Sequence, residues 1–145
     1  MGKGGSSMIG VVVVTHGQLA TELVNAAETI VGDMPGFAAV SIGWHEDTED
    51  ARHEIEQAVV RVDKGTGVLI LTDMFGGTPS NLAMSFLVKG KVEVITGVNL
   101  PMLIKLANQL EQAELLTIAR DIREQGRNAI WVATDLLHGE KTEKT

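Results

Sequence analysis

The stretch Ile9-Gly10-Val11-Val12-Val13-Val14-Thr15-His16-Gly17 decides the fold of this chain. Its run of branched apolar residues predicts a buried strand over residues 9–15, and a histidine follows at its end. In open parallel sheets, ligands bind beyond the carboxyl ends of the strands. His16 is therefore placed for chemistry, because imidazole is a good nucleophile when it is neutral.

Strand-like and helix-like stretches alternate along the rest of the chain. Strands are expected over 37–43, 68–72 and 92–96, with a short last strand over 129–133. Helices are expected over 18–31, from 47 or 48, over 80–88, from 99 or 100, and over a segment that carries Leu115 and Ile122 and stops at Gly126. The alternation predicts a three-layer α/β fold, in which a mainly parallel sheet of order 2-1-3-4 has helices on both faces.

The composition favours one domain and excludes several classes of function. With 3% aromatic residues, the core must consist of Val, Ile, Leu, Ala and Met. A net charge of −7 without any basic block argues against binding to nucleic acid or to an anionic membrane. The absence of cysteine excludes disulfides and thiolate zinc sites. We expect a cytoplasmic protein, since we see no signal peptide and no bilayer-length apolar run.

Polar segments follow the first, third and fourth expected strands, at residues 15–17, 73–81 and 97–101. The predicted strand order makes the first and third strands neighbours, which brings His16 and Asp73 to one edge. A carboxylate there would accept one ring N–H of the histidine, leave the other nitrogen free as the nucleophile and stabilise charge on the ring. The turn at Gly76, Gly77 and Thr78 would direct backbone N–H groups, and the Thr78 hydroxyl, at a phosphoryl group.

The segments Val13–Gly17, Leu71–Asn81 and Gly97–Leu103 resemble the enzyme IIA domain of the mannose family of the bacterial phosphoenolpyruvate-dependent sugar phosphotransferase system. The resemblance covers residues 8–134; residues 1–7 are interpreted as a flexible leader or a remnant of expression, and 135–145 as a polar tail. It implies a phosphotransferase that needs no cofactor and no metal.

The same resemblance implies the roles of individual residues and partners. His16 would receive a phosphoryl group on Nε2 from the phosphocarrier HPr and pass it to an enzyme IIB component, which here would be a separate chain. Asp73 would be the acid beside the histidine, and Thr78 the small hydroxyl residue of the glycine turn. The membrane would be reached only indirectly, through a IIC/IID permease. The family forms homodimers in which the last strand, here Ala129 to Ala133, crosses to the partner's sheet. Burial against a second subunit would explain the bulky apolar Trp131 in this short strand. The predicted phosphoryl-binding residues are Thr15, Gly17, Gly76, Gly77 and Thr78, and the predicted partner-binding residues are Met74, Phe75, Asn99 and Pro101.

Other interpretations stay open from the sequence. The same histidine could serve a regulatory module whose phosphorylation controls binding to another protein. A metal-dependent hydrolase could use His16, Asp73 and His45, although no compact ligand motif such as His-Glu-x-x-His is present. A dinucleotide-binding domain is disfavoured because the first strand ends in Thr-His-Gly. Asp73 and Asn99 could simply cap helices, and Phe75 could belong to the core.

Overall fold

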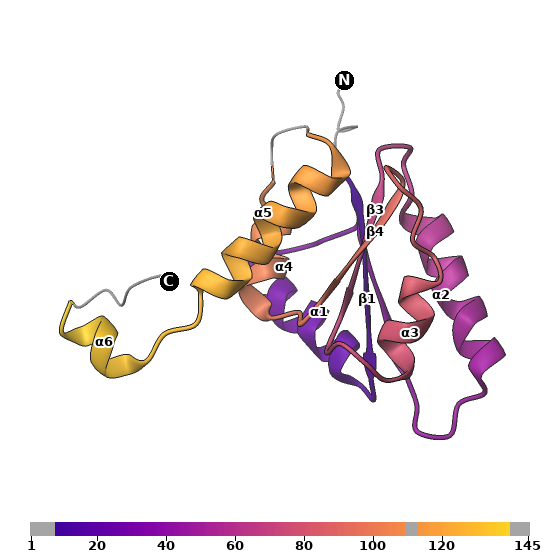
Figure 1. The fold of residues 1–145 in the computed structure, drawn as a ribbon, viewed down its shortest axis with the longest axis horizontal. Coiled ribbons are helices and arrows are strands. Elements are labelled where there is room, and N and C mark those ends of the chain that lie inside the picture. Colours follow the sequence, from indigo (N-terminus) through magenta and orange to yellow (C-terminus); the bar gives the residue numbers. More distant parts are fainter. Residues whose placement is uncertain (1–7, 110–112, 140–145) are drawn as a thin grey trace.

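The computed structural model describes residues 8–109 and 113–139, which form a parallel sheet with helices on both faces (Figure 1). The strands are β1 Gly10–His16, β2 Phe37–Ile42, β3 Val68–Thr72 and β4 Val92–Thr96. The helices are α1 Leu19–Val31, α2 Thr48–Val62, α3 Thr78–Met84, α4 Leu100–Ala107, α5 Leu115–Asn128 and α6 Ala133–Leu137. The strand order β2-β1-β3-β4, with every neighbouring pair parallel, confirms the predicted fold class and sheet order.

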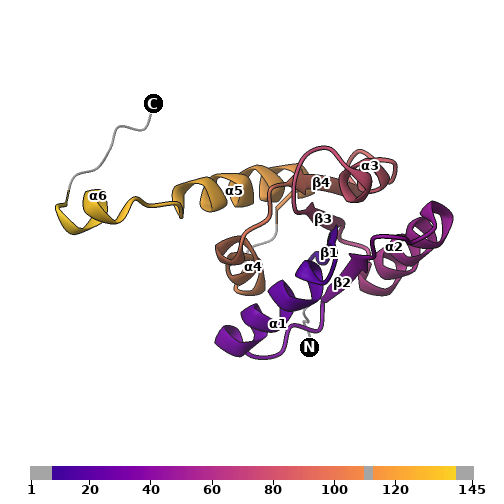
Figure 2. The same cartoon turned by 90° about the horizontal axis from the view of Figure 1, so that it is seen from below.

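Two apolar cores lie on opposite faces of the sheet. Alternate residues of β1 point into different cores: Val11 and Val13 pack with α1, α4 and α5, whereas Val12 and Val14 pack with α2 and α3. The two groups of helices are separated by the sheet in the view of Figure 2. All four valines are buried, which explains why β1 is apolar at every position instead of alternating. None of the helices in the described ranges has the length and apolar character required to cross a bilayer.

Side-chain caps begin two of the helices where the sequence predicted them. The Asp47 carboxylate accepts a hydrogen bond from the Glu49 N–H at 3.4 Å and begins α2. The Asn99 side-chain oxygen accepts one from the Met102 N–H at 3.2 Å and begins α4. Both polar side chains satisfy an N–H group that has no partner inside the helix.

Two of the predicted helix ends were wrong. Helix α3 stops at Met84 instead of residue 88, because the next residues form tight turns that lead into a bridge between Val88 and Val92. Helix α5 continues through Gly126 to Asn128. A Cβ atom on Gly126 would lie 2.6 Å from the Met102 sulfur, so this glycine permits close packing of α5 on α4 and is not a stop signal.

The predicted last strand over 129–133 is absent from this single chain. Residues 130–132 are exposed and belong to no helix or strand, and Ala133 already belongs to α6. A strand needs the backbone of a neighbour, and the segment leads away from the sheet toward the C-terminus in Figure 1. The described residues of one chain supply no such neighbour, so the exchange of this strand in a dimer stays a prediction.

Candidate functional site

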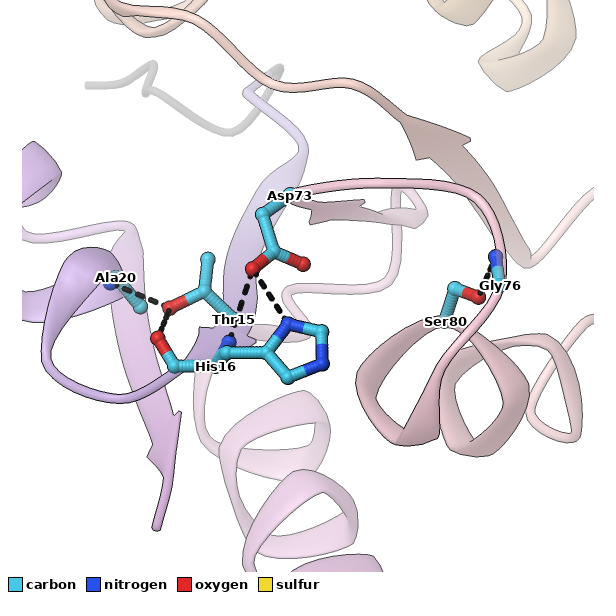
Figure 3. A network of polar contacts seen from close by, with 6 residues as sticks. All are labelled: Thr15, His16, Ala20, Asp73, Gly76 and Ser80. Carbon is cyan, nitrogen blue, oxygen red and sulfur yellow. Dashed lines mark hydrogen bonds and ion pairs between the residues drawn. The ribbon is translucent and has the colours of Figure 1, made fainter. Parts of the chain in front are cut away.

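The structure brings His16 and Asp73 together at the carboxyl edge of the sheet. His16 is the last residue of β1, and Asp73 directly follows the neighbouring strand β3. The Asp73 Oδ2 atom accepts a hydrogen bond from the His16 backbone N–H at 3.0 Å and lies 2.8 Å from the ring Nδ1 atom (Figure 3). One carboxylate oxygen therefore fixes both the backbone and the ring of the histidine.

The charge of Asp73 follows from these contacts. Burial alone would raise the pKa of this carboxyl group, but the hydrogen bonds from the His16 ring and backbone, together with the charge of the ring, hold the pKa below its usual value. An ionised Asp73 makes Nδ1 the nitrogen that carries the proton and leaves Nε2 with a free lone pair. The second carboxylate oxygen, Oδ1, is buried and has no hydrogen-bond partner among the described residues.

The glycine turn before α3 faces the free side of the imidazole. Gly77 has φ +91°, a conformation that favours glycine, and a Cβ atom there would lie 3.2 Å from both Cε1 and Nε2 of His16. The N–H groups of Gly77 and Thr78 have no acceptor among the described residues. Thr78 is exposed at the first position of α3. A group bound to Nε2 would thus meet this turn.

Ser80 supports the turn, a role that was not predicted from the sequence. Its side chain is completely buried, and its hydroxyl accepts a hydrogen bond from the Gly76 N–H at 2.8 Å (Figure 3). This bond ties the first glycine of the turn to the first turn of α3. The available signal was a serine shortly after Gly-Gly-Thr-Pro, because serine hydroxyls commonly bind backbone groups near helix starts.

Three of the predicted phosphoryl-binding residues have polar groups that are already engaged. The buried Thr15 hydroxyl accepts a hydrogen bond from the Ala20 N–H at 2.7 Å, which secures the start of α1. The Gly17 N–H donates to the Ile42 carbonyl at 2.9 Å, and the Gly76 N–H donates to Ser80. These groups hold the loops around His16, which leaves Gly77 and Thr78 with unengaged donors.

The predicted partner-binding residues differ in exposure. Met74 and Phe75 lie at the surface next to Asp73, with 55% and 74% of their areas exposed, so neither belongs to the core. Pro101 is exposed as well. Asn99 caps α4 with its side-chain oxygen and donates through Nδ2 to the Gly126 carbonyl at 3.1 Å, so its side chain has a structural role.

The geometry does not favour the metal-dependent hydrolase. His45 lies in the exposed loop after β2, and its ring packs edge-on against Trp44, with 6.3 Å between the ring centroids. In the described part of the chain, no three His, Cys, Asp or Glu side chains gather closely enough to hold a metal ion. His16 and Asp73 are consequently a pair, with His45 outside it.

The sequence matches a family of known proteins. The family described as "PTS system fructose IIA component" matches residues 10–122. The chain is 28% identical over 136 residues to the "PTS system fructose-specific EIIA component" of Bacillus subtilis, and the match covers 93% of each protein. It is 32% identical over 127 residues to the "PTS system mannose-specific EIIAB component" of Escherichia coli K12, covering 84% of this chain and 39% of that protein.

A solved structure agrees with the fold. The chain is similar to the crystal structure of the PTS IIA protein associated with the fucose utilization operon from Streptococcus pneumoniae, at 27% sequence identity and a TM-score of 0.80. The superposition covers 91% of this chain and 98% of that one. The sheet and its helices are therefore shared almost completely with that protein.

Proposed function

This chain belongs to the IIA components of the mannose family of the sugar phosphotransferase system, and we propose that it carries a phosphoryl group on His16 between a donor protein and an acceptor protein. Membership of the family gives the chain a place in a phosphoryl relay that serves sugar transport. The observation that carries the more specific proposal is the geometry of His16, with Nδ1 held by Asp73 and Nε2 facing Gly77.

Each residue of the site has a distinct part in the proposed transfer. The Nε2 lone pair attacks the phosphorus of a phosphohistidine on the donor, and the bond between phosphorus and the donor nitrogen breaks, with its electron pair returning to that nitrogen. Asp73 stabilises the positive charge that develops on the His16 ring, because its pKa keeps it ionised at neutral pH. The N–H groups of Gly77 and Thr78, with the Thr78 hydroxyl, bind the phosphoryl oxygens. Thr15, Gly17 and Gly76 hold the loops in place.

The donor in this proposal is HPr and the acceptor is an enzyme IIB component. The E. coli relative named EIIAB supports the choice of acceptor, since its printed name joins the two components. Phosphoryl transfer by positioning and hydrogen bonding needs no metal ion. In this proposal the protein is linked to the membrane only indirectly, through the IIC/IID permease that acts with IIB. Exposed Met74 and Phe75 contact these partners.

Phosphorylation by a reconstituted relay tests the proposal. The protein is incubated with phosphoenolpyruvate, enzyme I and HPr, and intact mass is measured before and after a IIB component is added. We expect one added phosphoryl group that is acid-labile, absent from His16→Gln, and lost again on addition of IIB. No modification while HPr is phosphorylated would refute the carrier role. If the protein is phosphorylated but passes the phosphoryl group to none of the IIB components encoded by neighbouring genes, the regulatory module is favoured instead.

We also propose that two copies pair through their C-terminal segments. Strand β4 pairs with one strand, β3; on its other edge the described residues pair only Val92, through the bridge to Val88. A groove of about 270 Å³ beside the rest of this edge is lined by β4 and α5. Ile130, Trp131 and Val132 lie between α5 and α6, are apolar and have about half or more of their area exposed. Addition of this segment to the open edge of a second copy would bury it. Sedimentation should give a dimer that Trp131→Asp converts to monomer; a monomeric wild type would refute the pairing.

A further inference from the structure

Two buried oxygen atoms beside His16 have no hydrogen-bond partner among the described residues. They are the hydroxyl oxygen of Thr72 and the second carboxylate oxygen of Asp73, Oδ1. The Thr72 side chain is completely buried, and Thr72 ends β3 directly before Asp73. A buried polar atom without a partner destabilises a fold, so each such atom calls for a physical explanation. A hydroxyl group can donate and an ionised carboxylate can only accept, so the two atoms are complementary.

The backbone contacts of Thr72 do not explain its hydroxyl group. Its carbonyl accepts hydrogen bonds from the N–H groups of Gly97 and Val98, both at 2.9 Å, which hold the end of β3 to the loop after β4. Valine would form the same bonds and has nearly the same shape, and the residue opposite Thr72 on β1 is the buried Val14. Since the hydroxyl oxygen is buried as well, it lies out of reach of a phosphoryl group at the surface. The hydroxyl group is thus a feature that packing does not require.

The Thr72 side chain and the His16 ring lie on one face of the sheet. Thr72 is opposite Val14 in register, and Val14 packs in the core beneath α2 and α3. Because side chains alternate along a strand, His16, two residues beyond Val14, points to the same face, in agreement with its closeness to Gly77 before α3. In Figure 3 the free carboxylate oxygen of Asp73 also points to the side of α3 and away from α1. The donor and the acceptor therefore belong to adjacent residues and face the same layer of helices.

We propose that Thr72 is a positioning residue, whose hydroxyl donates a hydrogen bond to Asp73 Oδ1, either directly after rotation about χ1 or through one bound water. This inference rests on the proposed function, since it adds a residue to the same site. The other oxygen, Oδ2, already accepts from the backbone of His16 and lies against its ring. A hydrogen bond at Oδ1 prevents the carboxylate from turning away from the ring and favours its ionised form.

Two substitutions at Thr72 separate the hydroxyl group from the methyl group. Thr72→Val keeps the shape and removes the hydroxyl, whereas Thr72→Ser keeps the hydroxyl and removes the methyl group. The initial rate of phosphorylation by phosphorylated HPr should fall by about tenfold in Thr72→Val, which corresponds to one hydrogen bond to a charged group, and by less than about threefold in Thr72→Ser. A residue that only fills space predicts the reverse order of the two rates.

The pKa of Asp73 provides a reading that packing alone does not change. It is measured by carbon NMR of the carboxyl group in wild type and in both variants. The Asp73 pKa should rise in Thr72→Val, because the ionised form loses a donor, and should return toward the wild-type value in Thr72→Ser. In a crystal structure of wild type, the Thr72 hydroxyl or a water that it binds should lie within about 3.2 Å of Oδ1, and the absence of both would refute the proposal.

The outcomes distinguish this inference from the proposed function. If wild type accepts no phosphoryl group, the carrier role fails, whereas the Asp73 pKa in the three proteins still tests the hydrogen bond. If wild type is phosphorylated but Thr72→Val keeps the wild-type rate and the wild-type Asp73 pKa, the carrier role stands and the positioning role is refuted. A hydroxyl without any partner destabilises the fold, so a higher melting temperature of Thr72→Val with an unchanged Asp73 pKa would also overturn the proposal.

Discussion

Replacement of Gly77 by alanine tests whether the glycine turn gives the phosphoryl group its space at Nε2. Gly77 has φ +91° and ψ 169°, a region that glycine alone adopts readily, so any side chain there costs about 1–3 kcal/mol. In addition, the new methyl group would lie 3.2 Å from Nε2 and Cε1 of His16, inside the usual carbon contact distance of about 3.5–4.0 Å. The imidazole must move away from the turn, or the turn from the imidazole.

The expected result of Gly77→Ala is a loss of transfer that exceeds its loss of stability. The methyl group occupies the side of the ring from which phosphorus approaches, and a displacement of about 1 Å in a reacting group can slow a reaction by about 10²-fold. We therefore expect the initial rate of phosphorylation by HPr to fall by about 10²-fold. The melting temperature, measured by calorimetry, should fall by about 3–12 °C, as expected for about 1–3 kcal/mol in a domain of this size, and by about the same amount in the control variant described next.

The chain offers a matched control in Gly76→Ala. Gly76 has φ +92°, almost the same as Gly77, but a Cβ atom there would meet nothing within 4 Å. This variant also carries a side chain at positive φ, but it lacks the contact with the imidazole. Its rate of phosphorylation should remain within about tenfold of wild type. Equal rates for the two variants, or a wild-type rate for Gly77→Ala, would refute the reasoning.

Three further perturbations probe the charges and the support of the site. Asp73→Asn should slow phosphorylation by about 10²-fold, because the ring loses its charge partner. The melting temperature of Asp73→Asn should be below that of wild type at neutral pH. Because the Asp73 pKa is lowered in the folded state, this difference should shrink as the pH falls below 3.8, the usual pKa of the group. A difference that does not depend on pH would contradict the pairing with His16. Ser80→Ala leaves the partly buried Gly76 N–H without its acceptor and should lower the unfolding free energy by about 1 kcal/mol as well as slow transfer. A stable variant with slow transfer would point to positioning alone, and wild-type values for both would exclude the supporting role. Glu54→Gln should stabilise the protein at pH 7 but not below about pH 4.5, because partial burial and a hydrogen bond with the Glu46 carboxylate raise the Glu54 pKa. Melting curves at the two pH values check this prediction. No gain in melting temperature at pH 7 would contradict it.

Much of the fold could be predicted from local patterns. The four consecutive valines of β1 require burial on both faces, which indicates a sheet between two layers of helices, and the caps at Asp47 and Asn99 are signals that need no tertiary information. The pairing of His16 with Asp73 followed from strand order alone, because adjacent parallel strands end at one edge.

The remaining differences depend on tertiary contacts. Gly126 was interpreted as a helix stop, but the glycine is required because α4 approaches α5 closely at Met102. The engagement of Gly17 with Ile42 depends on the neighbouring strand, and that of Gly76 with Ser80 depends on how the turn folds back. The sequence around Trp131 predicts a strand, but a strand forms only beside another strand. No such neighbour is present in the described part of the same chain.

The central claim is that Asp73 directs the phosphoryl group to Nε2 of His16. Nitrogen NMR of protein labelled in its imidazoles, recorded before and after phosphorylation by HPr, tests it most directly. The account predicts one new phosphohistidine, at residue 16, with the phosphorus coupled to Nε2 and the Nδ1 proton retained in its hydrogen bond to Asp73. Phosphorus on Nδ1, or on any other histidine, would contradict it.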